Sequence, residues 1–158
     1  DVAADASNAG RGARFEECGA GDVRGVVRNS SFSTNAEDDG LRVDEEDGGS
    51  VSLRLTDVLA VENDGQGLQV TENGDGDIVA LIFDSEFTDN GNTQIELEEA
   101  DAGAHDVEIR GSTIVGDGED SLDVIEEDDG NSVVRIIGST VSPDPVAGED
   151  DVDFQITP

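Results

Sequence analysis

The sequence repeats itself every 27 residues, and this repeat limits the folds open to the chain more than any other feature. Four similar segments start at positions 40, 67, 94 and 121: GLRVDEEDGG, GLQVTENGDG, QIELEEADAG and SLDVIEEDDG. They align in two apolar columns and one glycine column, namely Leu41, Leu68, Ile95 and Leu122; Val43, Val70, Leu97 and Val124; and Gly49, Gly76, Gly103 and Gly130. A repeat that keeps its register predicts a stack of equivalent structural units.

A second apolar stretch lies between these segments and has one anchor residue in each unit. The anchors are Phe32, Leu59, Phe87, Ile114 and Val141, at spacings of 27, 28, 27 and 27 residues. Further copies at the two ends add Ala13, Phe15, Val152 and Phe154, of which the last two come three residues late. In both stretches apolar and polar residues alternate, as is typical of short half-buried strands, and Gly, Asn and Asp at the breaks favour tight corners.

This pattern predicts an all-β parallel solenoid of about six coils of ~27 residues, roughly 30 Å long at ~4.8 Å per coil. We expect residues 1–158 to form a single domain. Residues 1–11 are predicted to be an N-terminal extension or cap, and residues 142–151 a loop insertion in the last coil.

The units GLRVDEEDGGSVSLRLTDVL (40–59) and GNSVVRIIGSTV (130–141) resemble the parallel β-helix repeats of the pectate-lyase-like superfamily. The resemblance covers residues 12–157 and implies a right-handed parallel β-helix. It does not select one activity, because this fold carries lyases, hydrolases, tailspikes, adhesins and metal-delivery proteins. Some lyases of the superfamily use Ca²⁺-binding acids with an Arg or Lys base; Arg110 lies among acids, but no lyase motif matches.

The chain carries 40 acidic and 8 basic residues, a formal net charge of -32, and its basic residues are all Arg. This charge excludes a classical nucleic-acid-binding module and argues against attraction to anionic lipid. No apolar run approaches the ~18 residues of a membrane span, so we predict no direct membrane insertion. The composition resembles that of proteins from extremely halophilic archaea, and because molar salt screens the repulsion between carboxylates, we predict that folding requires it.

Acidic residues gather after each first strand and are predicted to line one edge of the rod. The candidate metal ligands there are Asp44, Glu45, Glu46, Asp47, Glu72, Asp75, Asp77, Glu98, Glu99 and Asp101. Ca²⁺ prefers several oxygen ligands and would fit between coils. Diffuse association of Na⁺ or K⁺ is the alternative, because no EF-hand loop or calcium-binding nonapeptide is present.

A column of small polar residues precedes the anchors by two positions: Ser30, Asp57, Ser85, Ser112 and Ser139. A nucleophilic serine needs a base, and nothing in the sequence brings the only histidine, His105, to any of them, so we predict a hydrogen-bonded ladder. Cys18 is predicted to be a half-buried free thiol. Asn29 begins the sequence Asn-Ser-Ser and is a candidate glycosylation site.

These features favour a secreted or cell-surface rod with a structural or adhesive role, which stacks head to tail as a homo-oligomer or continues a longer solenoid. Residues 1–54 hold 6 Arg and 12 acids, whereas residues 55–158 hold 2 Arg and 28 acids, so the two ends differ in charge. One outward column is predicted to change from basic to acidic: Arg14, Arg42, Gln69, Glu96, Asp123 and Asp153. The alternative function is a polysaccharide lyase or glycoside hydrolase fragment that uses Ca²⁺ and surface carboxylates, with a polysaccharide as its partner.

Overall fold

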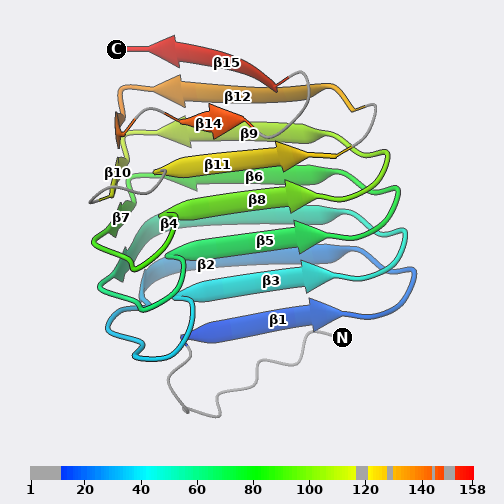
Figure 1. Cartoon of the computed structure of the whole chain (residues 1–158), viewed down its shortest axis with the longest axis horizontal. Coiled ribbons are helices and arrows are strands. Elements are labelled where there is room, and N and C mark those ends of the chain that lie inside the picture. The colour runs from blue at the N-terminus through cyan, green and yellow to red at the C-terminus, as the bar shows by residue number, and fades with distance from the viewer. Residues whose placement is uncertain (1–11, 117–120, 128–129, 144, 148–151) are drawn as a thin grey trace.

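The structure is a computed structural model that describes residues 12–116, 121–127, 130–143, 145–147 and 152–158. All its regular elements are β-strands, wound into about five turns of a parallel solenoid. In Figure 1 the strands in front run to the right and the chain returns to the left behind them while it rises, so the winding is right-handed. The predicted parallel β-helix is confirmed. Among the described residues, no helix long and apolar enough to span a membrane occurs.

One face of the solenoid is a sheet of six parallel strands stacked in chain order. These strands are β1 (Ala13–Glu17), β3 (Leu41–Glu45), β5 (Leu68–Glu72), β8 (Ile95–Glu99), β11 (Leu122–Glu126) and β14 (Val146–Ala147). Their register places the predicted columns one above the other, so that Leu41 pairs with Leu68 and Leu68 with Ile95. Both apolar columns are buried from the second coil to the fifth.

The opposite face is a second parallel sheet, which the chain enters after each strand of the first (Figure 1). Its long strands are β2 (Val23–Ser31), β4 (Val51–Val61), β6 (Ile78–Phe83), β9 (His105–Arg110), β12 (Ser132–Ile137) and β15 (Val152–Thr157). The short strands β7 (Glu86–Thr88), β10 (Thr113–Val115) and β13 (Thr140–Ser142) stack on the second half of β4. A residue with positive φ lies at this bend in each coil: Asn29, Asp57, Asp84, Gly111 and Gly138.

The following corner is held by a ladder of side-chain amides. Asn35 Nδ2 donates to Asn63 Oδ1 at 2.5 Å, Asn63 Nδ2 donates to Asn90 Oδ1 at 2.7 Å, and Asn90 Nδ2 donates to Gln94 Oε1 at 2.6 Å. Asn63 and Asn90 are buried, and each also donates to a backbone carbonyl. The ladder therefore satisfies polar groups that an apolar corner would leave without partners.

One predicted anchor is wrong. Leu59 pairs with Glu86 and is 38% exposed, whereas Ala60 pairs with Phe87 and is buried. Because Ser31 pairs with Leu59, the column that contains Phe32 continues through Ala60. The 28-residue spacing therefore separates Phe32 from Ala60, and Ala60 is 27 residues from Phe87. The apolar character of Leu59 conceals this one-residue shift in the sequence.

The last coil also differs from the prediction. Val152 and Phe154 pair with Ser132 and Val134 in the second sheet, and not with the first-sheet columns. Asp153 accordingly lies beside Val133, and it does not continue the outward column of the first sheet. The reason is that β14 already takes the first-sheet position of this coil, so the next strand, β15, falls in the second sheet.

Part of the predicted loop 142–151 is a strand. Val146 and Ala147 form β14 and pair with Asp123 and Val124, which adds a sixth strand to the first sheet. Residues 144 and 148–151 lie outside the described residues, as does the whole of the predicted extension 1–11.

Candidate functional site

The ten predicted metal ligands divide between the interior and the surface of the rod. Glu46, Asp47, Asp75, Asp77 and Asp101 are exposed, and Glu98 is half-buried. Glu45, Glu72 and Glu99 are 0% exposed, and Asp44 is also buried. The structure therefore does not bring the ten carboxylates to one surface site, and the metal assignment stays a prediction.

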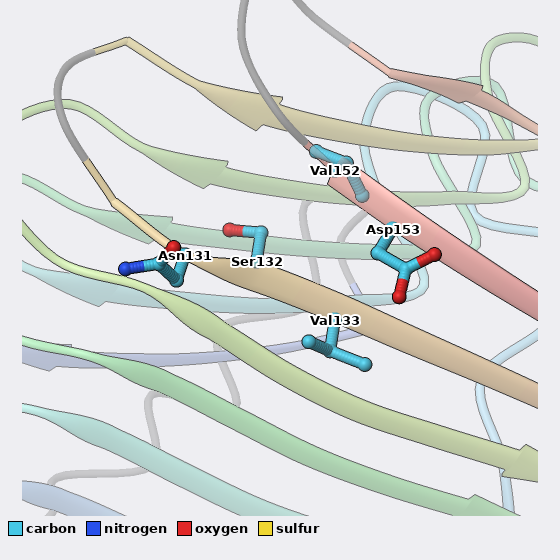
Figure 2. A pocket seen from close by; sticks show the side chains of 5 residues that line it. All are labelled: Asn131, Ser132, Val133, Val152 and Asp153. Atoms are coloured by element: carbon cyan, nitrogen blue, oxygen red, sulfur yellow. The ribbon is translucent and has the colours of Figure 1, made fainter.

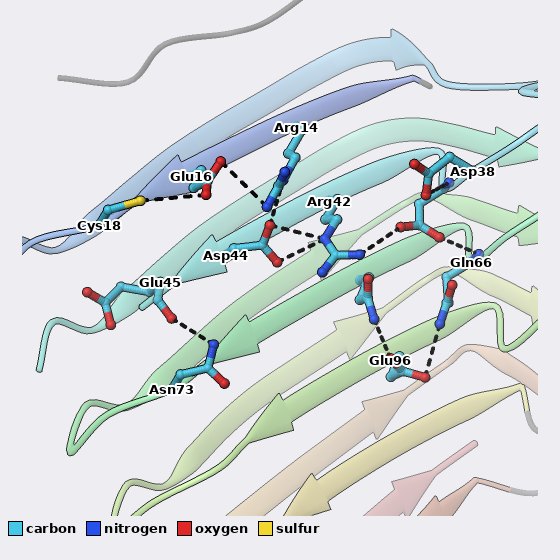
Figure 3. Close-up of polar contacts among 12 residues, drawn as sticks. Arg14, Glu16, Cys18, Asp38, Arg42, Asp44, Glu45, Gln66, Asn73 and Glu96 are labelled. Atoms are coloured by element: carbon cyan, nitrogen blue, oxygen red, sulfur yellow. Dashed lines mark hydrogen bonds and ion pairs between the residues drawn. The ribbon is translucent and has the colours of Figure 1, made fainter. Parts of the chain in front are cut away.

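Asp44 is neutralised by two arginines on the outer face of the first sheet (Figure 3). Arg14 Nε donates to Asp44 Oδ2 at 2.7 Å, and Arg42 Nε donates to Asp44 Oδ1 at 2.9 Å. Arg42 Nη1 also lies 3.8 Å from Asp39 Oδ2. Because both guanidinium groups are engaged with acids, a cation would have to displace an arginine to bind Asp44.

The same face changes character toward the carboxyl end, as predicted for its first five members. Arg14, Arg42, Gln69, Glu96 and Asp123 pair in sequence from strand to strand. Gln69 Nε2 donates to Glu96 Oε1 at 2.7 Å, so neighbouring members of this column contact one another. This outward column thus passes from basic to acidic residues along the rod.

The end of the first sheet carries a column of inward-facing glutamates, which we call the glutamate column. Its members are Glu17, Glu45, Glu72, Glu99 and Glu126, each paired with the next through adjacent strands. Glu17 is half-buried and the other four are 0% exposed. The sequence contained a signal for this position, because the alternation that turns Leu41 and Val43 inward also turns Glu45 inward.

Turn N–H groups compensate part of the charge in the column. Gly19 N donates to Glu17 Oε2 at 2.9 Å, Asp47 N donates to Glu45 Oε1 at 3.3 Å, and Asp101 N donates to Glu99 Oε1 at 3.0 Å. Such bonds to a buried carboxylate stabilise its charged form. Glu17, Glu45 and Glu99 therefore close the turns that follow β1, β3 and β8.

Glu72 is compensated more weakly, because the N–H of Gly74 favours its charged form without making a hydrogen bond of standard geometry. No donor makes a hydrogen bond of standard geometry to Glu72 Oε1 or Oε2, although both oxygens are buried. Burial, followed by contact with Glu45, raises the pKa of Glu72 to about 7. Burial also raises the pKa of Glu99 above its ordinary value. The middle of the column is thus where the carboxylate charge is least tolerated.

His105, Ser132 and Glu126 form a polar cluster beside the carboxyl end of the column. Ser132 Oγ donates to Glu126 Oε2 at 2.9 Å and lies 2.9 Å from His105 Nδ1, which is 3.4 Å from the same carboxylate oxygen. His105 and Ser132 occupy a core column that Val51 and Ile78 continue. Burial lowers the pKa of His105 to about 4, so the imidazole is neutral at pH 7. The sequence alone does not reveal this contact, because His105 and Ser132 stand one coil apart.

The predicted serine ladder is present in three coils. Each serine hydroxyl accepts from the backbone N–H of the preceding coil. Val58 N donates to Ser85 Oγ, Ser85 N donates to Ser112 Oγ, and Ser112 N donates to Ser139 Oγ, each at 3.1 Å. Val58, and not Asp57, occupies the second coil's place, since Ser30 pairs with Val58. Within the part of the chain that the structure describes, none of these ladder serines is hydrogen-bonded to His105, whose serine partner is Ser132, and this fits a structural ladder.

Asn29 and Cys18 are both exposed. Glycosylation of Asn29 stays a prediction.

The predicted half-burial of Cys18 is wrong, because its thiol lies at an open corner and donates to Glu16 Oε1 at 3.5 Å (Figure 3). Glu16, Cys18 and Glu46 form the one group of the described residues that offers three metal-ligand atoms within 4.8 Å of one another. Local desolvation and the two carboxylates raise the pKa of the thiol to about 11, which disfavours the thiolate that a metal needs.

Two shallow grooves lie on the second sheet near its amino-terminal edge. One, of about 390 Å³, lies between the starts of β12 and β15 and is lined by Asn131, Ser132, Val133, Val152 and Asp153 (Figure 2). The other, of about 350 Å³, extends from Asp77 to Arg135. Arg110, the basic residue considered for a lyase, is bound to Glu108 at 3.0 Å. Neither groove contains this arginine.

Comparison with known proteins found no matching family model, no similar curated protein and no similar solved structure. The function is therefore inferred from the geometry of the chain.

Proposed function

We propose that the chain is a structural or adhesive rod whose copies stack head to tail, working outside the cell in molar salt. The resemblance of its repeats to pectate-lyase-like β-helices, found in secreted and surface proteins, supports this placement. The charge of -32 and the composition similar to halophilic proteins support the salt requirement. Each carboxylate of the surface adds repulsion that only a high cation concentration screens.

The observation that carries the proposal is the exposure of Ile156. Ile156 belongs to the core column that runs through Ile82, Ile109 and Ile136, whose members are at most 1% exposed. Ile156 itself is 60% exposed, because β15 pairs only with β12 among the described strands. At the other end of the same column, Val27 of β2 is only half-buried. One further coil would bury both residues.

A second copy supplies that coil in register. If β2 of one copy continues the ladder after β15 of another, Val27 falls beside Ile156 and Arg24 beside Asp153. Arg24 has a side chain that is 77% exposed and is paired with Asp22 at 2.7 Å, and Asp153 is exposed as well. The contact therefore joins apolar to apolar and brings Arg24 to a second carboxylate. It is heterologous and does not close, so repetition gives a filament.

Electron microscopy in 2–3 M KCl tests this stacking. The carbonyl of Thr157 accepts from Gly138 N at 2.9 Å, so the N–H of Ile156 faces away from β12. Ile156→Pro removes that outward donor and retains the ladder to β12, whereas Ile156→Val keeps both the donor and an apolar side chain. We expect end-to-end filaments from the wild type and from Ile156→Val, and single rods from Ile156→Pro. Single wild-type rods at high protein concentration would refute the stacking.

A further inference from the structure

The carboxylates in the middle of the glutamate column have more acceptors than donors. Glu45 Oε2, Glu99 Oε2 and both oxygens of Glu72 are buried and have no hydrogen-bond partner when all three groups are ionised. They lie on successive strands, one strand spacing of ~4.8 Å apart. Three adjacent charges at this spacing repel strongly where the dielectric constant is far below that of water.

Protons fill these positions better than a metal ion does. The side chains of Glu72 and Glu45 are within hydrogen-bonding reach of each other, and so are those of Glu72 and Glu99. Ca²⁺ would need six to eight oxygen ligands, which is more than the facing carboxylate oxygens of one gap offer. A proton needs one donor oxygen and one acceptor oxygen, which is what each gap provides.

We propose that the glutamate column binds protons, with Glu99 and Glu72 as neutral carboxylic acids that donate to Glu72 and Glu45 respectively, while Glu45 remains a carboxylate. Glu45 is suited to the ionised end, because it also accepts from Asp47 N. Each shared proton removes one buried charge and supplies one missing donor. The rod then loses stability when rising pH empties the column.

Further titratable groups lie at both ends of the row formed by Glu45, Glu72 and Glu99. Glu17 on β1 ends it at the half-buried side, and Glu126 on β11 ends it at the other, bonded to Ser132. His105 on β9 titrates in the opposite sense, since its folded pKa lies below the ordinary value. The stability that His105 confers falls as the pH drops, so it partly hides the effect of Glu72 in the wild type. Comparison with a Glu72 variant cancels this contribution.

Glu72→Gln is the test, because its amide supplies a permanent donor and carries no charge. Folded and ordinary pKa values of about 7 and 4.5 make the unfolding constant of the wild type, relative to that of Glu72→Gln, rise roughly 70-fold between pH 5 and pH 8.5. The constants are measured by urea unfolding in 3 M KCl. Glu86→Gln is the matched control in the same coil, with an exposed carboxylate, and it should follow the wild-type pH profile.

Infrared spectroscopy of the folded protein gives an independent readout. We expect a protonated carboxyl band in the wild type at pH 6 that is lost above pH 8 and is weakened in Glu72→Gln. A ratio of unfolding constants that does not change with pH, or no protonated band, would overturn the proposal. So would millimolar Ca²⁺ that stabilises the wild type at pH 8.5 and not Glu72→Gln, because the column would then hold a cation.

Discussion

Two adjacent glycines after β3 allow a sharp test of how closely the coils approach. A Cβ on Gly49 would overlap the carbonyl oxygen of Gly21 in the coil below and lie 3.0 Å from Glu45 Oε1. A Cβ on Gly48 would meet no atom within 4 Å. Gly49→Ala and Gly48→Ala thus make the same chemical change in the same turn, and only the first forces two coils apart.

The cost follows from the hydrogen bonds on either side of this turn. Glu46 N donates to Glu17 O at 3.1 Å, and Val23 N donates to Ser50 O at 3.0 Å. A separation of the coils by about 1 Å breaks both, at ~1–3 kcal/mol for each donor left without a partner, and adds strain. We expect Gly49→Ala to lower the free energy of unfolding by about 3–5 kcal/mol, a large part of a typical domain's ~5–15 kcal/mol.

Urea unfolding followed by circular dichroism in 3 M KCl measures both variants. Gly48→Ala should lie within ~0.5 kcal/mol of the wild type, or be slightly more stable because alanine restricts the unfolded chain. Equal shifts of the urea midpoint in the two variants would refute the reasoning, because the close approach would then have no energetic consequence.

Asn63→Ala should cost about 2–4 kcal/mol in the same assay, because it removes bonds to Asn90 and to a backbone carbonyl, while exposed Asn92→Ala should be neutral. His105→Val should abolish an acid-side loss of about 3 kcal/mol, since a folded pKa near 4 makes stability present above pH 6.5 fall as the pH drops through 4. Lowering KCl from 3 M to 0.1 M should reduce the thermal midpoint by roughly 10 °C, and an equal concentration of NaCl should restore it. Alkylation of Cys18 at pH 8 should be slower in the folded than in the unfolded chain, by mass spectrometry, because its pKa is raised to about 11.

Much of the architecture follows from the sequence, because the alternation of apolar and polar residues predicts the strands and the 27-residue period predicts their stacking. The columns through Leu41 and Val43 were identified by counting, and they stack as predicted. Leu59 shows where counting fails, since two adjacent apolar residues can each take the anchor position and only the pairing of coils selects Ala60. For Val152 the alternation predicts a strand, but β14 already holds the first-sheet position of that coil, so the strand of Val152 joins the second sheet.

The candidate site was less accessible to sequence reasoning. Acidic residues are ordinarily solvated, so Glu45 and Glu72 were grouped with their exposed neighbours, although their place in the alternation pointed inward. The contact between His105 and Ser132 spans a coil and depends on register that no single segment contains.

The sequence by itself determined that the chain forms stacked strands with a strongly anionic surface, because period, alternation and net charge are properties of the chain read in order. Only the tertiary structure decided which carboxylates lose their water and which neighbouring groups face them, because that depends on coils that are distant in sequence and one strand spacing apart in space.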